Sequence, residues 1–202
     1  EHTGQCFRNC GLRETLSEIN KQIEGVPFLV HYALKANVNP KLLAEIKKAG
    51  LGADCVSGGE VQAAIDAGIE PSKIAFAGVG KADWEINLAL GHDIFCFNVE
   101  SIPELEVINE LAGAKGKTAR VALRINPDID AHTHHKITTG LNENKFGINM
   151  EDMTKVVELL PTFDHIHVVG VHFHVGSQIT DLTVFQDLCV RLSEIQQFFL
   201  DK

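Results

Sequence analysis

The sequence lacks the signals that would assign it at once to several common protein classes. No apolar run approaches the roughly 20 residues that a membrane-spanning helix needs, and the chain opens on no signal peptide. The five cysteines are an odd number with no Cys-x-x-Cys pair, which favours free thiols in a reducing, cytoplasmic setting. The net charge of -9, with acidic residues scattered along the chain, argues against a nucleic-acid partner. We therefore expect neither nucleic acid nor membrane among its partners.

Short runs rich in β-forming residues alternate with longer helical patterns along the 202 residues. Strand candidates lie at 28–35, 51–56, 73–77, 93–98, 119–126 and 166–175. Helical patterns lie near 12–24, 40–49, 59–68, 82–90, 102–114, 151–160 and 181–200. Two helices begin with the spacing of a capping box, Ser57 with Glu60 and Ser101 with Glu104. The alternation predicts an α/β fold in which crossover helices connect parallel strands.

The segment AGVGKAD, residues 77–83, matches neither of two common nucleotide-binding patterns. Gly78 and Gly80 lack the third glycine of the dinucleotide-binding pattern, and Lys81 is followed by alanine where a P-loop has Ser or Thr. Without these signals we favour a closed barrel over an open doubly wound sheet. A complete (β/α)8 barrel of the TIM type has eight strand–helix units in typically about 250 residues. The sequence shows about six such units, so we predict an incomplete barrel that forms one domain over residues 1–202.

Polar residues stand at the carboxyl ends of the predicted strands, which is where a parallel α/β barrel has its active site. In chain order they are Lys35, Asp54 with Ser57, Gly78 with Gly80, Asn98, Arg124 with Asn126, and His172 with His174. The alternation of side chains along a strand places Arg124 with Asn126, and His172 with His174, on shared faces. These residues are the candidates for chemistry.

Lys35 ends the first predicted strand, in the segment HYALKANVNP, residues 31–40. By alternation it shares a face with the small residue Ala33. A lysine amine in a partly desolvated pocket loses its preference for the charged form and becomes a nucleophile, the usual route to a Schiff base. The alternative is an ordinary exposed lysine at a strand end, which is common.

The segment HVVGVHFHVGSQ, residues 167–178, carries two further candidates. The pair His172 and His174 has the spacing of two imidazoles that bind one metal ion, although one of them can equally be a packed core residue. Gly176 lets the backbone approach a ligand closely, and Ser177 offers a hydroxyl near a helix start, as a phosphate contact does. A loop-and-cap role explains the Gly-Ser pair equally well.

Two other segments have a polar character at predicted loops or strand ends. The segment DAHTHHKITTG, residues 130–140, holds three histidines that are either solvated loop residues or substrate contacts. Asp54 ends an apolar strand and needs a partner there, for which a histidine from another strand end is suitable.

Five motifs together identify a family that this chain resembles. They are YALKAN, GADCVSGGE, ALRINPDIDAHTH, TGLNENKFGI and GVHFHVGSQI, and they run from about residue 28 to the end of the chain. Their order and spacing are similar to those of diaminopimelate decarboxylases, pyridoxal-phosphate enzymes that combine an alanine-racemase-like barrel with a C-terminal β domain. The resemblance implies decarboxylation of meso-diaminopimelate to L-lysine, in the pathway of lysine biosynthesis.

The resemblance also implies roles for single residues. Lys35 matches the family lysine that holds pyridoxal 5'-phosphate covalently, and His174 matches the histidine that stacks on the pyridine ring. Ser177 matches a serine that contacts the phosphate, while Asp54 and Arg124 match polar residues that line the cofactor pocket. We therefore expect Lys35 and His174 to be catalytic, all five residues to bind the cofactor, and no residue to bind a metal.

Other parts of the family pattern have no counterpart in these 202 residues. They include further phosphate contacts, the acid facing the pyridine nitrogen, substrate-binding residues, the last barrel strands and the C-terminal β domain. The opening EHTGQCFRNCG does not match the family either. We expect this chain alone to have little or no decarboxylase activity, and the full-length protein to be a homodimer, as its relatives are.

Three alternatives stay open on the sequence. The chain can belong to an ornithine-type or arginine-type decarboxylase of the same fold, against which the DAHTH and ENKFGI segments argue. It can be a barrel that binds pyridoxal phosphate without catalysis. It can also be a metal-dependent barrel hydrolase that uses His172 and His174, although such enzymes usually carry their His-x-His pair on the first strand.

Overall fold

Strands and helices alternate along the chain in the computed structural model, which describes residues 9–126, 146–176 and 180–201. The chain divides into two compact units, residues 1–95 and 96–202. Each of the six strands and seven helices expected from the sequence has a counterpart among the described residues. None of the helices in these ranges combines the length and the apolar character that a membrane crossing requires.

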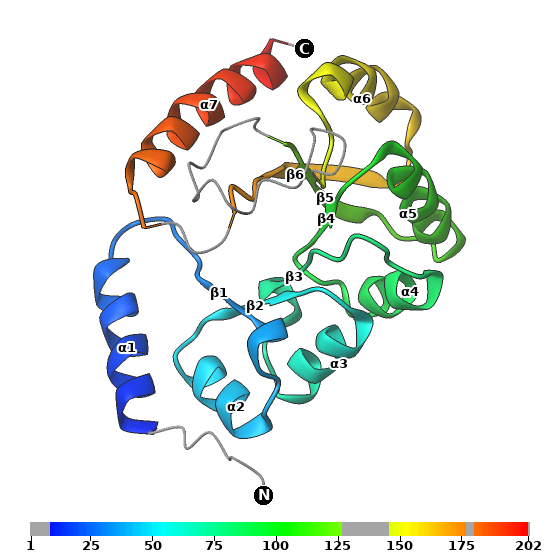
Figure 1. Ribbon diagram of the computed structural model, residues 1–202. Coiled ribbons are helices and arrows are strands. Elements are labelled where there is room, and N and C mark those ends of the chain that lie inside the picture. Colours follow the sequence, from blue (N-terminus) through cyan, green and yellow to red (C-terminus); the bar gives the residue numbers. More distant parts are fainter. Residues whose placement is uncertain (1–8, 127–145, 177–179, 202) are drawn as a thin grey trace, which may run out of the picture. The chain divides into compact units, whose positions relative to one another are not determined.

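The first unit consists of three short parallel strands and four α-helices (Figure 1). In chain order they are α1 Asn9–Gln22, β1 His31–Ala33, α2 Pro40–Lys48, β2 Gly52–Cys55, α3 Gly58–Asp66, β3 Ile74–Phe76 and α4 Asp83–His92, with 3-10 turns at Leu34–Ala36 and Pro71–Lys73. Strand β2 pairs in parallel with both β1 and β3. Helix α3 packs against β2, β3 and α4. The first unit therefore repeats a strand followed by a crossover helix.

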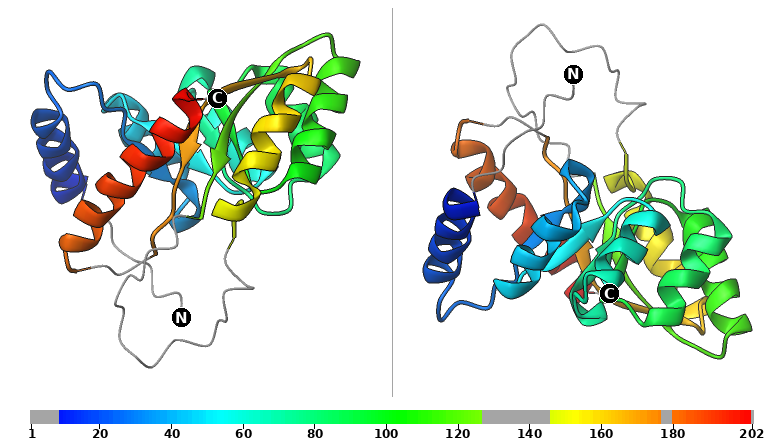
Figure 2. Two further views of the ribbon diagram at one scale, coloured as in Figure 1. Left: turned by 90° about the horizontal axis from the view of Figure 1, so that it is seen from above. Right: turned by 90° about the horizontal axis from the view of Figure 1, so that it is seen from below.

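The second unit continues the same alternation. Its elements are β4 Cys96–Val99, α5 Ile102–Ala114, β5 Ala119–Arg124, α6 Met153–Leu159, β6 Ile166–His172 and α7 Thr183–Leu200, with 3-10 turns at Met150–Asp152 and Leu160–Thr162. Strand β5 pairs in parallel with β4 and β6, and its register with β6 shifts between Val121 and Ala122. Helix α5 packs against β5 and β6, and Figure 2 shows these elements from two further directions.

Apolar side chains from strands and helices fill the interior of each unit. In the first unit Phe76, Ile74 and Leu43 are fully buried, and in the second unit Phe97 and Leu105 are. Burying one such side chain contributes about 1.5–3 kcal/mol to folding. Strands β2, β3 and β4 are buried along most of their length, as predicted for strands covered on both faces. Strand β6 differs, because all its side chains are exposed or half-buried.

Both candidate capping boxes are confirmed, with one difference in geometry. The hydroxyl of Ser57 accepts a hydrogen bond from the N–H of Glu60 at 3.3 Å, and Ser101 serves Glu104 in the same way. The carboxylate of each glutamate accepts a hydrogen bond from the residue before the serine and not from the serine itself, which is the difference in geometry. Glu60 accepts from the N–H of Val56, and Glu104 accepts from the N–H of Glu100. The serines are therefore the N-caps that directly precede α3 and α5.

Several strand boundaries predicted from the sequence are wrong. The first strand begins at His31 and not at 28, and Phe28 is 70% exposed. The sixth strand ends at His172, two residues before His174. A strand lasts only as long as a neighbouring strand supplies hydrogen-bond partners, and this limit has no sign in the apolar pattern of the sequence.

Candidate functional site

Lys35 lies just past the carboxyl end of β1, in the 3-10 turn Leu34–Ala36. The N–H of Asn37 donates to the carbonyl of Leu34 at 3.0 Å and closes this turn. The prediction that Lys35 continues the strand on the face of Ala33 is therefore wrong. Lys35 is exposed, so the expected desolvation of its amine is not seen in this structure. The structure gives the amine no ion-pair or hydrogen-bond partner among the described residues.

The next residues explain why the chain turns at Lys35. The side chain of Asn39 accepts a hydrogen bond from the N–H of Lys41 at 2.9 Å and caps α2, which begins with Pro40. A capping asparagine followed by proline is a strong helix start. The strand consequently gives way to a helix within a few residues, and the turn between them carries Lys35.

Asp54 lies on β2, directly beside Ala33 of β1 in the parallel register. It is half-buried and is not without interactions. The same register pairs His31 with Gly52, so these four residues share one face of the two strands. Asp54 therefore lies beside the end of β1, and Lys35 follows that end.

The imidazole of His31 occupies the space that a side chain at position 52 would need. A Cβ on Gly52 would lie 2.4 Å from Cδ2 of His31, and the ring stacks on Phe95 with centroids 6.1 Å apart. Burial lowers the pKa of His31, and this effect is partly countered by the charge of Asp54 and by a hydrogen bond to the backbone of Leu29. The histidine whose pKa feels the charge of Asp54 is thus His31, at the start of β1, and a histidine from another strand end as the partner of Asp54 stays a prediction.

Glu85 connects the two segments that follow β2 and β3. Its carboxylate accepts a hydrogen bond from the N–H of Gly58 at 2.6 Å and another from the N–H of Ala82 at 2.9 Å. Gly78, in the segment after β3, approaches Val56 so closely that a Cβ there would lie 2.6 Å from the carbonyl oxygen of Val56. These contacts fix the segments at the carboxyl ends of β2 and β3.

Arg124 is the last residue of β5, and its guanidinium forms an ion pair with Glu100, which directly follows β4. Nη1 of Arg124 donates to Oε1 of Glu100. Only 12% of the arginine side chain and 7% of the glutamate side chain are exposed. The pair is thus a mostly buried one at the carboxyl ends of two neighbouring strands.

Phe146 and Gly147 pack against Arg124. The guanidinium carbon lies 5.6 Å from the centroid of the Phe146 ring. Gly147 has a φ of +99°, and a Cβ there would lie 2.9 Å from the carbonyl oxygen of Arg124. The N–H of Ile148 donates to the same carbonyl at 2.8 Å. The described part of the ENKFGI motif therefore packs against the arginine.

His172 and His174 differ in their placement. His172 ends β6 and is half-buried, opposite Arg124 in the parallel register. His174 lies two residues past the strand and is exposed, and both histidines make contacts. No group of three His, Cys, Asp or Glu side chains is arranged to bind a metal within the ranges that the structure describes. Ser177 and the segment 130–140 lie outside those ranges.

The candidate residues thus fall into two sets, one in each unit. The first unit places Lys35 and Asp54 at the ends of neighbouring strands, and the second unit does the same for Arg124 and the histidines. Sequence reasoning overlooked Glu100 and Glu85. A signal for Glu100 existed, because it directly follows an apolar strand, as Asp54 ends one.

The sequence matches one protein family over residues 11–199, which is described as the pyridoxal binding domain of pyridoxal-dependent decarboxylases. The chain belongs to this family. Its cofactor is accordingly pyridoxal phosphate.

The curated relatives are named diaminopimelate decarboxylase. The protein from Bacteroides thetaiotaomicron is 61% identical over 92% of this chain, and the protein from Aquifex aeolicus is 42% identical over 86% of it. The matches cover 48% and 41% of those two relatives, respectively. The chain spans about half the length of the curated relatives it matches.

Solved structures of related enzymes share the fold. A mutant of Helicobacter pylori diaminopimelate decarboxylase complexed with L-lysine matches with a TM-score of 0.85 and 39% identity, covering 94% of this chain and 48% of that one. A viral arginine decarboxylase from Paramecium bursaria Chlorella virus matches with a TM-score of 0.74 and 26% identity, covering 91% of this chain and 47% of that one. The chain therefore has an α/β fold that forms part of the TIM-type barrel of these decarboxylases, as the sequence predicts.

The side chains described above fit the chemistry of pyridoxal phosphate. An aldehyde cofactor needs a primary amine, and Lys35 offers one at an exposed position after β1. The anionic oxygens of the cofactor need cationic donors, and Arg124 carries N–H groups that Glu100 does not use. The aromatic ring of the cofactor needs a flat partner, which the imidazole of His174 can supply.

Proposed function

We propose that this chain carries the cofactor-binding part of a diaminopimelate decarboxylase, which converts meso-diaminopimelate to L-lysine and carbon dioxide. The observation that carries the proposal is the 61% identity to a diaminopimelate decarboxylase over 92% of the chain. The arginine decarboxylase with the same fold is only 26% identical, which argues against a decarboxylase of the arginine or ornithine type. Three of the solved diaminopimelate decarboxylase structures were complexed with L-lysine, the product of the proposed reaction.

Five residues of this chain serve the cofactor in this proposal. Lys35 binds it covalently through its amine, and His174 holds the ring from one side. Asp54 and Arg124 line the pocket with opposite charges, and Ser177 contacts the phosphate. When bound, pyridoxal phosphate supplies the electron sink that allows an amino acid to lose carbon dioxide. The protein contributes orientation and charge, and Lys35 contributes the amine that would hold the cofactor.

We further propose that residues 1–202 are part of a single barrel domain, in a cytoplasmic protein that works as a homodimer. The described cysteines support the reducing compartment, since Cys55, Cys96 and Cys189 are free thiols. The dimer rests on the resemblance to the family, whose members share sites at a dimer interface.

The attachment of the cofactor can be tested directly. The chain is mixed with pyridoxal 5'-phosphate, reduced with borohydride, digested, and the modified residue is mapped by mass spectrometry. We expect the label on Lys35, and we expect Lys35→Ala to abolish it. Lys41→Ala is the matched control, because this exposed lysine lies nearby on α2 and should not affect labelling. A label on another lysine, or none in the unchanged chain, contradicts the proposal.

The substrate requires the complete protein. Release of carbon dioxide is measured with meso-diaminopimelate, L-ornithine and L-arginine at equal concentrations. We expect meso-diaminopimelate to be preferred by at least about 100-fold in kcat/KM. Ornithine and arginine lack its second carboxylate, so the charged group of the site that binds this carboxylate stays unpaired when they bind. Preference for ornithine or arginine contradicts the substrate assignment. Labelled Lys35 without turnover of any of the three contradicts the catalytic function and leaves a cofactor-binding protein.

A further inference from the structure

Glu100 stands in an unusual position for an acidic residue. It directly follows β4, it is 8% exposed, and its carboxylate meets the guanidinium of Arg124 at the end of β5. Taking two charges out of water is costly, and a buried ion pair is a weak source of stability for that reason. A purely structural need for this pair is therefore a poor explanation of it.

The carboxylate of Glu100 is not required to start the following helix. The hydroxyl of Ser101 caps α5 by accepting from the N–H of Glu104, and the carboxylate of Glu104 accepts from the N–H of Glu100 at 2.7 Å. Oε1 of Glu100 accepts a hydrogen bond from Nη1 of Arg124, while Oε2 is buried without a hydrogen-bond partner among the described residues. The hydrogen bonds of this carboxylate in the described structure thus go to Arg124 alone.

Arg124 retains hydrogen-bonding capacity beyond this pair. A guanidinium has five N–H donors in a rigid plane, and the described residues accept from Nη1 only. The ring of Phe146 lies 5.6 Å from the guanidinium carbon. Glu100 and Phe146 therefore restrain the guanidinium at two places. Nε and Nη2 have no acceptor among the described residues, and such N–H groups suit a ligand with anionic oxygens.

We propose that Glu100 is a positioning residue, which holds the Arg124 guanidinium so that its remaining N–H groups bind an anionic oxygen of pyridoxal phosphate. This inference rests on the proposed function, because it takes Arg124 as a residue of the cofactor pocket. It adds a carboxylate that acts on the cofactor only through the arginine. The ring of Phe146 adds a second contact to the guanidinium.

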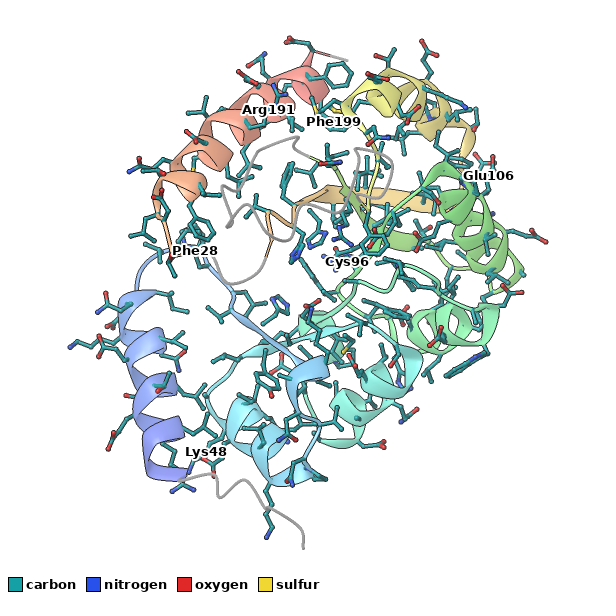
Figure 3. All side chains as sticks on the ribbon, viewed as in Figure 1. Phe28, Lys48, Cys96, Glu106, Arg191 and Phe199 are labelled. Atoms are coloured by element: carbon teal, nitrogen blue, oxygen red, sulfur yellow. The ribbon has the colours of Figure 1, made fainter. Side chains whose placement is uncertain are left out.

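The test uses the chain with pyridoxal 5'-phosphate and five variants. They are Glu100→Ala, Glu100→Gln, Arg124→Met, the double variant Glu100→Ala with Arg124→Met, and the control Glu106→Ala. Glu106 is an exposed acidic residue on the adjacent helix α5 and is labelled in Figure 3. The dissociation constant is measured by titration at the visible absorption band of the bound cofactor, and thermal unfolding and borohydride labelling of Lys35 are recorded for every variant.

We expect Glu100→Ala to weaken cofactor binding by at least about 10-fold, because the arginine loses its restraint. Glu100→Gln keeps an oxygen that accepts from Nη1 and should stay within about threefold of the unchanged chain. The double variant should bind as weakly as Arg124→Met alone and no weaker, since Glu100 acts through Arg124. Glu106→Ala should bind like the unchanged chain.

Different results overturn different statements. A Glu100→Ala variant that unfolds at lower temperature but binds the cofactor as before gives Glu100 a structural role and overturns this inference alone. A double variant that binds at least 10-fold more weakly than Arg124→Met alone overturns it as well, because Glu100 then acts without the arginine. An unchanged chain that forms no adduct at Lys35 overturns the proposed function together with the inference. Should Glu100→Ala not fold, Glu100→Asp replaces it, with an expected loss of at least threefold, and unchanged binding by Glu100→Asp overturns the inference.

Discussion

The carboxylate of Glu85 accepts a hydrogen bond of 2.6 Å from the backbone N–H of Gly58. Its second oxygen accepts from the N–H of Ala82 at 2.9 Å, at the start of α4. One side chain thus accepts hydrogen bonds from N–H groups at the starts of two helices. N–H groups at a helix start have no acceptor within the helix itself. The negative charge also lies where the dipoles of both helices favour it.

We predict that Glu85→Ala lowers the free energy of unfolding by about 2–3 kcal/mol, because two N–H groups lose a charged acceptor. Glu85→Gln should fall between the unchanged chain and Glu85→Ala. Urea denaturation followed by circular dichroism measures the change. Glu70→Ala is the control, since Glu70 forms only an exposed pair with Lys73 and its loss should cost under about 0.5 kcal/mol. Equal losses for Glu85→Ala and Glu70→Ala would contradict the prediction.

Gly58 and Gly59 form a matched pair at the start of α3. A Cβ on Gly58 would lie 2.8 Å from Cγ of Glu85 and 2.9 Å from the ring of Trp84, whereas a Cβ on Gly59 meets nothing nearer than 3.8 Å. We predict that Gly59→Ala stabilises the chain by up to about 1 kcal/mol through helix propensity. Gly58→Ala should destabilise it by about 1–3 kcal/mol, because Glu85 must move from its two hydrogen bonds. The same urea titrations measure both, and stabilisation by Gly58→Ala would show that Glu85 yields without loss.

The lowered pKa of His31 leads to a prediction of how the stability of the chain changes with pH. Burial lowers the pKa of its imidazole in the folded chain, so the unfolded chain binds the proton more tightly. The free energy of unfolding should therefore fall as the pH drops below about 6.5, the ordinary pKa of histidine, towards the lower value of the folded state. Above that range the contribution of His31 is fully present.

The comparison that isolates this residue is between the unchanged chain and His31→Gln. Urea titrations from pH 8 to pH 5 should show a smaller loss of stability on acidification for His31→Gln. The exposed His167 provides a control, and His167→Gln should keep the pH dependence of the unchanged chain. Identical pH profiles for all three proteins would mean that His31 titrates in the folded chain as it does in the unfolded one.

The sequence predicted the order of the elements because each depends on residues close in the chain. The alternation of short β-rich runs and helical patterns gave six strands and seven helices, and all have counterparts in the structure. The serine–glutamate spacings at Ser57 and Ser101 predicted two helix starts correctly, since the cap and its N–H partner lie three residues apart. The family was also identified correctly from motifs that are contiguous in the chain.

The ends of strands were predicted less well. Lys35 was placed in the first strand because Phe28 to Leu34 are apolar or small, but the strand ends at Ala33 and a turn carries the lysine. The pairing with β2 covers only His31 to Ala33. A strand end depends on where the neighbouring strand stops, and that neighbour lies elsewhere in the sequence.

The sequence by itself determined the α/β alternation, the helix caps and the motifs that carry Lys35, Asp54, Arg124 and His174. Only the tertiary structure decided which side chains hold these segments in place, such as Glu100 with Arg124 and Glu85 with Gly58. The physical reason is the range of the interactions. Periodicity and capping act over three or four residues, whereas an ion pair between two strand ends forms only after parallel pairing has brought distant residues together.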